Sequence, residues 1–171
     1  PADRIITREQ LACMLLPLAD PALRWEGYDD EDCGDALRIA VGNGFLAPEN
    51  RTGPEGHVSG AHAEVHAKGH VSGAHAYDHA PRLMPDGHVT RQEMATVAMQ
   101  ACGVNYRNAS STMPVCADAA LVNNNYGTNV ARALYFGFMS LEPDGCFKPR
   151  RPVTIGEAAG ILNRVADFAG I

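Results

Sequence analysis

The chain has 171 residues, of which 46% are hydrophobic and 20% are charged, and its formal net charge is −6. This length and hydrophobic fraction predict a folded domain with a real core and exclude wholesale disorder. The acidic balance argues against a nucleic-acid partner, and no apolar run approaches the roughly 20 residues of a transmembrane segment.

The first predicted element is a helix that follows Thr7. Thr7 and Gln10 have the spacing of a capping box, in which a hydroxyl and a side chain three positions later bond to each other's backbone amides. The chain opens at Pro1 without an initiator Met, so we expect a processed or excised piece that has lost its targeting information.

The same capping-box pattern occurs twice more, at Thr90 with Glu93 and at Thr154 with Glu157. Apolar residues follow each threonine at matching offsets, which predicts three amphipathic helices that bury their stripes against each other. The stripes consist of Leu11, Met14, Leu15 and Leu18, of Met94, Val97, Ala98 and Ala101, and of Ala158, Ile161, Leu162 and Val165.

Shorter helical patterns precede the second and third capped helices, at residues 31–45 and 126–138. Gly44 and Gly137 suit the left-handed position that ends a helix, and turns rich in Pro, Asp and Gly follow. Without a histidine-rich tandem copy at 56–81, the repeat is about 60 residues long, which indicates an array of similar modules.

This layout resembles the S-layer homology (SLH) module, with its turn of the type "G..DG.F.P" before "ITRAE". Residues 137–157 read "GFMSLEPDGCFKPRRPVTIGE", and the chain opens with "ADRIITREQ". We therefore expect one domain of three units: 1–20 as the second half of unit 1, 21–104 as unit 2 with a histidine-rich insertion at about 50–82, and 105–171 as unit 3.

The resemblance implies an all-α, mostly helical fold with pseudo-threefold symmetry around a central three-helix bundle. It also implies a non-catalytic, extracellular module of the cell wall or S-layer. Such modules bind an anionic, often pyruvylated, secondary cell-wall polysaccharide and retain a larger surface protein. A missing N-terminal segment or a neighbouring chain would complete unit 1, and self-association is left open. A secreted enzyme with its catalytic part elsewhere is a further alternative.

The family's "TRAE" arginine lies at the grooves between units, and Arg8 and Arg91 occupy that position. A guanidinium beside a helix start suits an anionic sugar, although both arginines could equally be solvated first-turn residues. Ile155 replaces the third arginine, so at most two grooves are expected to be competent. The expected ligand-binding residues are Arg8, Arg91, Thr7, Thr90 and Glu93, with Asp29 and Asp30; in unit 3 the family's acid corresponds to Asp118.

Six of the seven histidines lie in the segment 56–81, with several i, i+4 pairs. They are the candidate ligands for Zn²⁺, Ni²⁺ or Cu²⁺, although no cofactor is required by the family and the glycines argue against a helix there. A metal-binding module, a neutral expanded loop and a pH-responsive surface stay open as alternatives. These residues are His57, His62, His66, His70, His75 and His79.

The five cysteines are scattered and contain no CxxC pair, which disfavours a structural zinc site. Buried free thiols are the expected state, and a single disulfide between Cys102 and Cys116 is the alternative. The sequence also lacks the GxSxG, P-loop and Rossmann motifs, which agrees with a non-catalytic protein.

Overall fold

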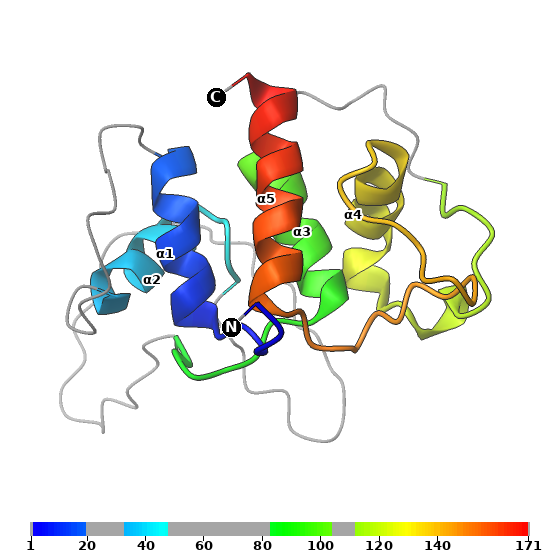
Figure 1. Cartoon of the computed structure of the whole chain (residues 1–171), viewed down its shortest axis with the longest axis horizontal. Coiled ribbons are helices and arrows are strands. Elements are labelled where there is room, and N and C mark those ends of the chain that lie inside the picture. Colours follow the sequence, from blue (N-terminus) through cyan, green and yellow to red (C-terminus); the bar gives the residue numbers. More distant parts are fainter. Residues whose placement is uncertain (1, 20–32, 48–82, 104–111, 171) are drawn as a thin grey trace, which may run out of the picture.

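A computed structural model describes residues 2–19, 33–47, 83–103 and 112–170. These residues form helices and connecting turns, and they contain no strand apart from three isolated bridges. The elements, in chain order, are α1 (Arg8–Ala19), α2 (Cys33–Gly42), α3 (Arg91–Ala101), the 3₁₀ helix η1 (Ala119–Leu121), α4 (Asn124–Tyr135) and α5 (Ile155–Ala169) (Figure 1). The expected all-α class is therefore confirmed.

Helices α1, α3 and α5 begin at the three predicted capping boxes. In α1, Thr7 N–H donates to Gln10 Oε1 at 3.1 Å and Gln10 N–H donates to Thr7 Oγ1 at 3.2 Å. Thr154 and Glu157 exchange the same two bonds at the start of α5. In α3 the amide of Thr90 donates to the Glu93 carboxylate at 2.8 Å. These helices therefore start where the capping boxes predict.

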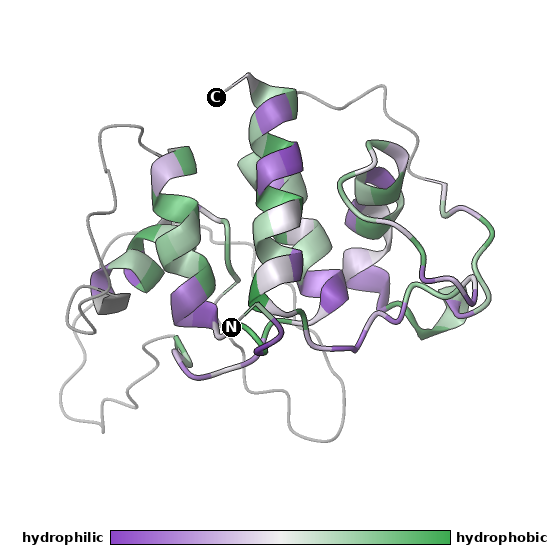
Figure 2. Cartoon of the chain, viewed as in Figure 1, coloured by the Kyte–Doolittle hydropathy of each residue, from purple (hydrophilic) through white to green (hydrophobic). Residues whose placement is uncertain are grey.

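The predicted apolar stripes of these three helices form the core. Each of α1, α3 and α5 contacts the other two, and α5 lies in front of α3 in Figure 1. Figure 2 shows that α1 is largely apolar above a polar first turn. Of the twelve stripe residues only Met14 and Leu18 are partly exposed, whereas the other ten are buried. Burial of these side chains supplies the main favourable free energy of folding.

Helices α2 and α4 pack against α1 and α3 respectively, and α2 and α4 lie at opposite sides of α5 in Figure 1. Each of them ends where the sequence predicts, because Gly44 and Gly137 adopt positive φ values of 76° and 73°. Only glycine reaches this region without steric cost. The first helix of predicted units 2 and 3 thus packs on the capped helix that precedes it in the chain.

The starts of the three capped helices are joined in a closed ring. Bridges connect Thr7 with His88, Thr90 with Pro152, and Thr154 with Ile5. The first helical amides of each capped helix donate to backbone carbonyls of another unit; examples are Arg8 N–H to Gly87 O at 2.8 Å and Arg91 N–H to Arg151 O at 3.0 Å. The unit boundaries and an overall pseudo-threefold symmetry stay predictions.

The described helices do not resemble membrane spans. None of the helices within the described ranges is long and apolar enough to cross a bilayer.

Candidate functional site

Arg8 and Arg91 are the first residues of α1 and α3, directly after the threonine of each capping box. Their side chains are buried, with only 3% and 6% of their surface exposed. The alternative that they are solvated first-turn residues is therefore wrong. A buried guanidinium requires acceptors for its donors, and these acceptors define the site.

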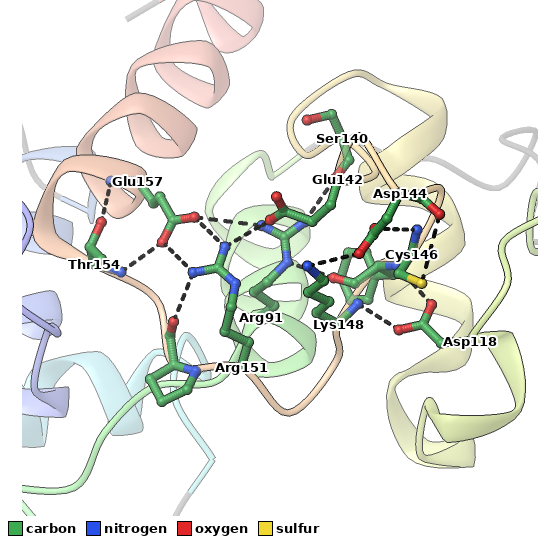
Figure 3. A network of polar contacts seen from close by, with 12 residues as sticks. Arg91, Asp118, Ser140, Glu142, Asp144, Cys146, Lys148, Arg151, Thr154 and Glu157 are labelled. Carbon is green, nitrogen blue, oxygen red and sulfur yellow. Dashed lines mark hydrogen bonds and ion pairs between the residues drawn. The ribbon is translucent and has the colours of Figure 1, made fainter.

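Arg91 reaches across to the turn that precedes α5 (Figure 3). Its Nε donates to the carbonyl of Phe147 and its Nη2 donates to the carbonyl of Ser140, both at 2.7 Å. The guanidinium carbon also lies 4.9 Å from the centre of the Phe147 ring, which is a cation–π contact. One side chain thus holds both ends of the segment between Ser140 and Phe147.

Arg8 makes the corresponding contacts in the preceding unit. Its Nε donates to the carbonyl of Leu83 at 3.2 Å, and its Nη2 donates to the carbonyl of Ala47. Leu83 and Ala47 occupy the positions of Phe147 and Ser140 in the repeat. Both arginines therefore connect one unit to the two ends of the next unit's turn. Their direct contact with a ligand stays a prediction.

Two carboxylates and a second arginine surround the guanidinium of Arg91. Arg91 Nη1 lies 3.6 Å from Glu142 Oε1 and 3.8 Å from Glu157 Oε1. Arg151 bridges the same two acids, with Nη2 at 3.0 Å from Glu142 Oε1 and Nη1 at 3.1 Å from Glu157 Oε2 (Figure 3). Two cations alternate with two anions, so the charges of this network cancel.

These contacts shift the acid–base equilibria of the network. The hydrogen bond from Arg151 holds the pKa of Glu157 below its ordinary value, against the opposing effect of burial. Burial and the charge of Arg151 lower the pKa of Arg91, and the Glu142 and Glu157 carboxylates oppose this change. Glu157 therefore has two roles, because it also caps α5 through Thr154.

Asp118 fixes the backbone that leads into the turn at residues 148–151. Its two carboxylate oxygens accept the amides of Phe147 and Lys148, each at 2.7 Å. Burial alone would raise the pKa of Asp118, but these bonds outweigh it and the pKa lies below the ordinary value. Lys148 itself has a φ of 56°, an unfavourable conformation for a residue with a side chain, so the turn depends on such support.

A cavity of about 220 Å³ opens beside this turn. Arg150 is exposed and, among the described residues, has neither a hydrogen bond nor an ion pair. Lys148 is 41% exposed and pairs with Asp144 at 2.9 Å. The lining therefore combines apolar surface with an excess of positive charge, in a chain whose net charge is negative. The lining residues are Asp118, Leu121, Lys148, Pro149, Arg150 and Arg151.

The corresponding turn of the preceding unit has a similar backbone but different charges. Met84 stands where unit 3 has Lys148, and it also has a positive φ, of 46°. Pro85 matches Pro149, while Asp86 and Gly87 replace the two arginines. Of these two turns, only the one at 148–151 presents cations.

The remaining predicted residues divide into two groups. Thr7, Thr90 and Glu93 lie in the capping boxes, beside the arginines but engaged in helix starts. The second group lies outside the described residues and consists of Asp29, Asp30, His57, His62, His66, His70, His75 and His79. Within the described ranges no cluster of three or more His, Cys, Asp or Glu could hold a metal ion, and the metal hypothesis stays a prediction.

Sequence reasoning missed the cations that line the pocket. The family's arginine position predicted Arg8 and Arg91, which are buried. The cations that line the cavity are instead Lys148, Arg150 and Arg151. The signal was present in the sequence "KPRRP", which concentrates three positive charges in one short segment of an acidic chain. Because Arg151 is paired with Glu142 and Glu157, Arg150 and Lys148 are the cations that can bind a carboxylate on a small, partly apolar group.

Comparison with known proteins gives one family match. Residues 122–159, which include α4, the turn at 148–151 and the start of α5, match the family model described as S-layer homology domain. No curated protein and no solved structure matches the chain.

Proposed function

We propose that this chain, in which residues 122–159 form an S-layer homology domain, binds an acidic cell-wall polysaccharide through the pocket at 148–151 and so holds a larger surface protein on the bacterial envelope. S-layer homology domains are non-catalytic modules that bind cell-wall polymers, and their presence implies a protein associated with the cell surface. The carboxylate of a pyruvylated sugar is the expected ligand group.

The observation that carries this proposal is Arg150, an exposed residue that has no hydrogen bond or ion pair within the described part of the chain and belongs to the lining of a partly apolar cavity. Arginine presents its donors in a planar fork that matches the two oxygens of a carboxylate. Lys148 adds a second positive charge on the same turn. Leu121, which is 58% exposed, offers apolar surface to the methyl group and ring carbons of a pyruvylated sugar.

Arg91 supports this site from behind the turn. Because it holds the carbonyl of Phe147, it fixes the residue directly before Lys148. In this proposal Arg91 is a positioning residue, and the exposed cations of the turn make the contact with the polymer. A ligand that displaced Arg91 from its two carbonyls would leave both acceptors without a partner.

Co-sedimentation with purified cell walls tests the proposal. We expect the chain to pellet with walls that retain their secondary polymer and to stay in the supernatant when that polymer has been removed. Equal pelleting with walls that retain the polymer and with walls that have lost it would contradict the proposal.

The chain itself supplies a matched variant. Lys148→Met with Arg150→Asp gives this turn the residues that unit 2 carries at the corresponding positions, where the backbone has the same positive φ. The substitutions reverse the charge of the pocket without demanding a new conformation. We expect at least a tenfold weaker binding to intact walls. Arg38→Ala, at an exposed residue of α2, is the control and should bind like the unchanged chain.

A further inference from the structure

Two cysteines of unit 3 lie on neighbouring backbone segments. The amide of Ala117 donates to the carbonyl of Gly145 at 3.2 Å, and the residues that adjoin this bond are Cys116 and Cys146. Both thiols are partly exposed, whereas those of Cys13 and Cys102 are buried. The bond therefore brings the two cysteines opposite each other in a part of the surface that solvent can reach.

A shared carboxylate gives a second, independent observation of this proximity. Cys116 Sγ donates to Asp118 Oδ1 at 3.3 Å, and the same oxygen accepts the amide of Phe147 at 2.7 Å. Phe147 directly follows Cys146. Figure 3 shows the Asp118 carboxylate turned toward this stretch of backbone. One oxygen atom thus contacts both the thiol of Cys116 and the residue next to Cys146.

From this geometry we infer that Cys116 and Cys146 form a disulfide when the protein meets a disulfide oxidant. The oxidant is a small disulfide such as oxidised glutathione. One protein thiolate attacks an oxidant sulfur, which breaks the S–S bond and releases one reduced glutathione. The second protein thiolate then attacks the mixed disulfide and releases another. Two cysteine thiols are oxidised, one glutathione disulfide is reduced, and the two thiol protons end on the two glutathiones.

The bond would close a loop that contains η1, α4 and the segment held by Arg91. Constraint of such a loop reduces the entropy of the unfolded chain, so the oxidised protein should unfold at a higher temperature. We expect an increase of Tm on the order of 10 °C. The inference does not depend on the proposed function, since it uses only the positions of the two cysteines.

The groups around these thiols also predict how the rate depends on pH. Burial and the hydrogen bond to Asp118 raise the pKa of the Cys116 thiol, and burial with the charges of Asp144 and Asp118 raises that of Cys146, while Lys148 opposes the latter. The thiolate is the attacking species and is scarce at neutral pH. The rate of closure should therefore rise roughly tenfold from pH 7 to pH 8.

The experiment treats the full chain with oxidised glutathione, alkylates the remaining thiols and identifies the linked peptides by mass spectrometry. The expected product links Cys116 to Cys146 and therefore carries two fewer alkyl groups than the reduced chain alkylated in the same way. Cys116→Ser and Cys146→Ser should each abolish this product, while Cys102→Ser should leave it unchanged. The inference would be overturned if both thiols were still alkylated after treatment or if either were linked to another cysteine. A rate of closure that does not change with pH would also overturn it.

Discussion

Arg8 and Arg91 donate the same pair of hydrogen bonds at corresponding places in two repeats. Arg8 bonds to the carbonyls of Leu83 and Ala47, and Arg91 bonds to those of Phe147 and Ser140. Each guanidinium therefore joins a capped helix to the turn of the following unit. The repeat is held together by these buried arginines as well as by the apolar core.

Arg91→Ala tests the energetic importance of this contact. The substitution leaves two carbonyls without a donor and removes the buried cation between Glu142 and Glu157. We expect the free energy of unfolding, measured by urea titration, to fall by about 2–4 kcal/mol. Arg91→Lys should recover little of this loss, because an ammonium lacks the planar fork that reaches both carbonyls.

Arg38→Ala is the matched control for Arg91→Ala. Arg38 pairs with Asp35 on the surface of α2, where its side chain is 75% exposed. Its removal should change the free energy of unfolding by less than about 0.5 kcal/mol. Equal effects of the two substitutions would contradict the role given to Arg91.

A second prediction concerns the connection between Ala47 and Leu83. Arg8 bonds to both residues, and in unit 3 the corresponding residues are joined by only the segment 141–146. Replacement of 48–82 by a copy of 141–146, with Ser in place of the cysteine, should therefore preserve the fold. A shorter loop loses less entropy on closure, so we expect a gain of about 1–2 kcal/mol in a urea titration. Loss of cooperative unfolding or of helical circular dichroism would refute this.

The same shortened chain tests the metal hypothesis for the six histidines. Under that hypothesis the full chain binds Zn²⁺ stoichiometrically, and the shortened chain, which lacks all six, does not. Isothermal titration of both chains measures the difference. Equal, stoichiometric binding by both would place the metal elsewhere.

Acid should destabilise the protein through Glu157 and Asp118. Both have pKa values below their ordinary 4.5 and 3.8, so their contribution is complete above those values and is lost as the pH falls through the lower, folded-state values. We expect the urea midpoint to be flat near pH 6 and to fall below about pH 4.5.

Glu157→Gln identifies the source of this acid sensitivity. The amide keeps a capping oxygen for Thr154 but removes the charge that pairs with Arg151. Stability should fall at pH 6, and the remaining dependence on pH below 4.5 should be shallower than in the unchanged chain. An identical dependence would show that Glu157 does not contribute.

The helix starts and the apolar stripes could be predicted from the sequence because their causes are local. A threonine and an acid or amide three residues later determine a cap, and the spacing of apolar residues determines a buried face. The helix ends at Gly44 and Gly137 could also be predicted, because a positive φ strongly favours glycine. The burial of Arg8 and Arg91 was not predicted, because their acceptors belong to a turn of another unit.

The pocket was missed for a similar reason. Its wall joins Asp118 and Leu121 to the turn at 148–151, and only the fold brings these segments together. Asp118 was recognised as the family's acid, but its bonds to the amides of Phe147 and Lys148 depend on that same contact between distant segments.

The most direct test of the central claim is a calorimetric titration of the chain with soluble fragments of the acidic wall polymer, compared with the same fragments after chemical reduction of their carboxyl groups to alcohols. Recognition by Arg150 and Lys148 predicts binding of the acidic fragments that weakens with added salt, at least tenfold weaker binding of the reduced fragments, and a similar loss in the Lys148→Met, Arg150→Asp variant. Equal affinity for acidic and reduced fragments would contradict the account.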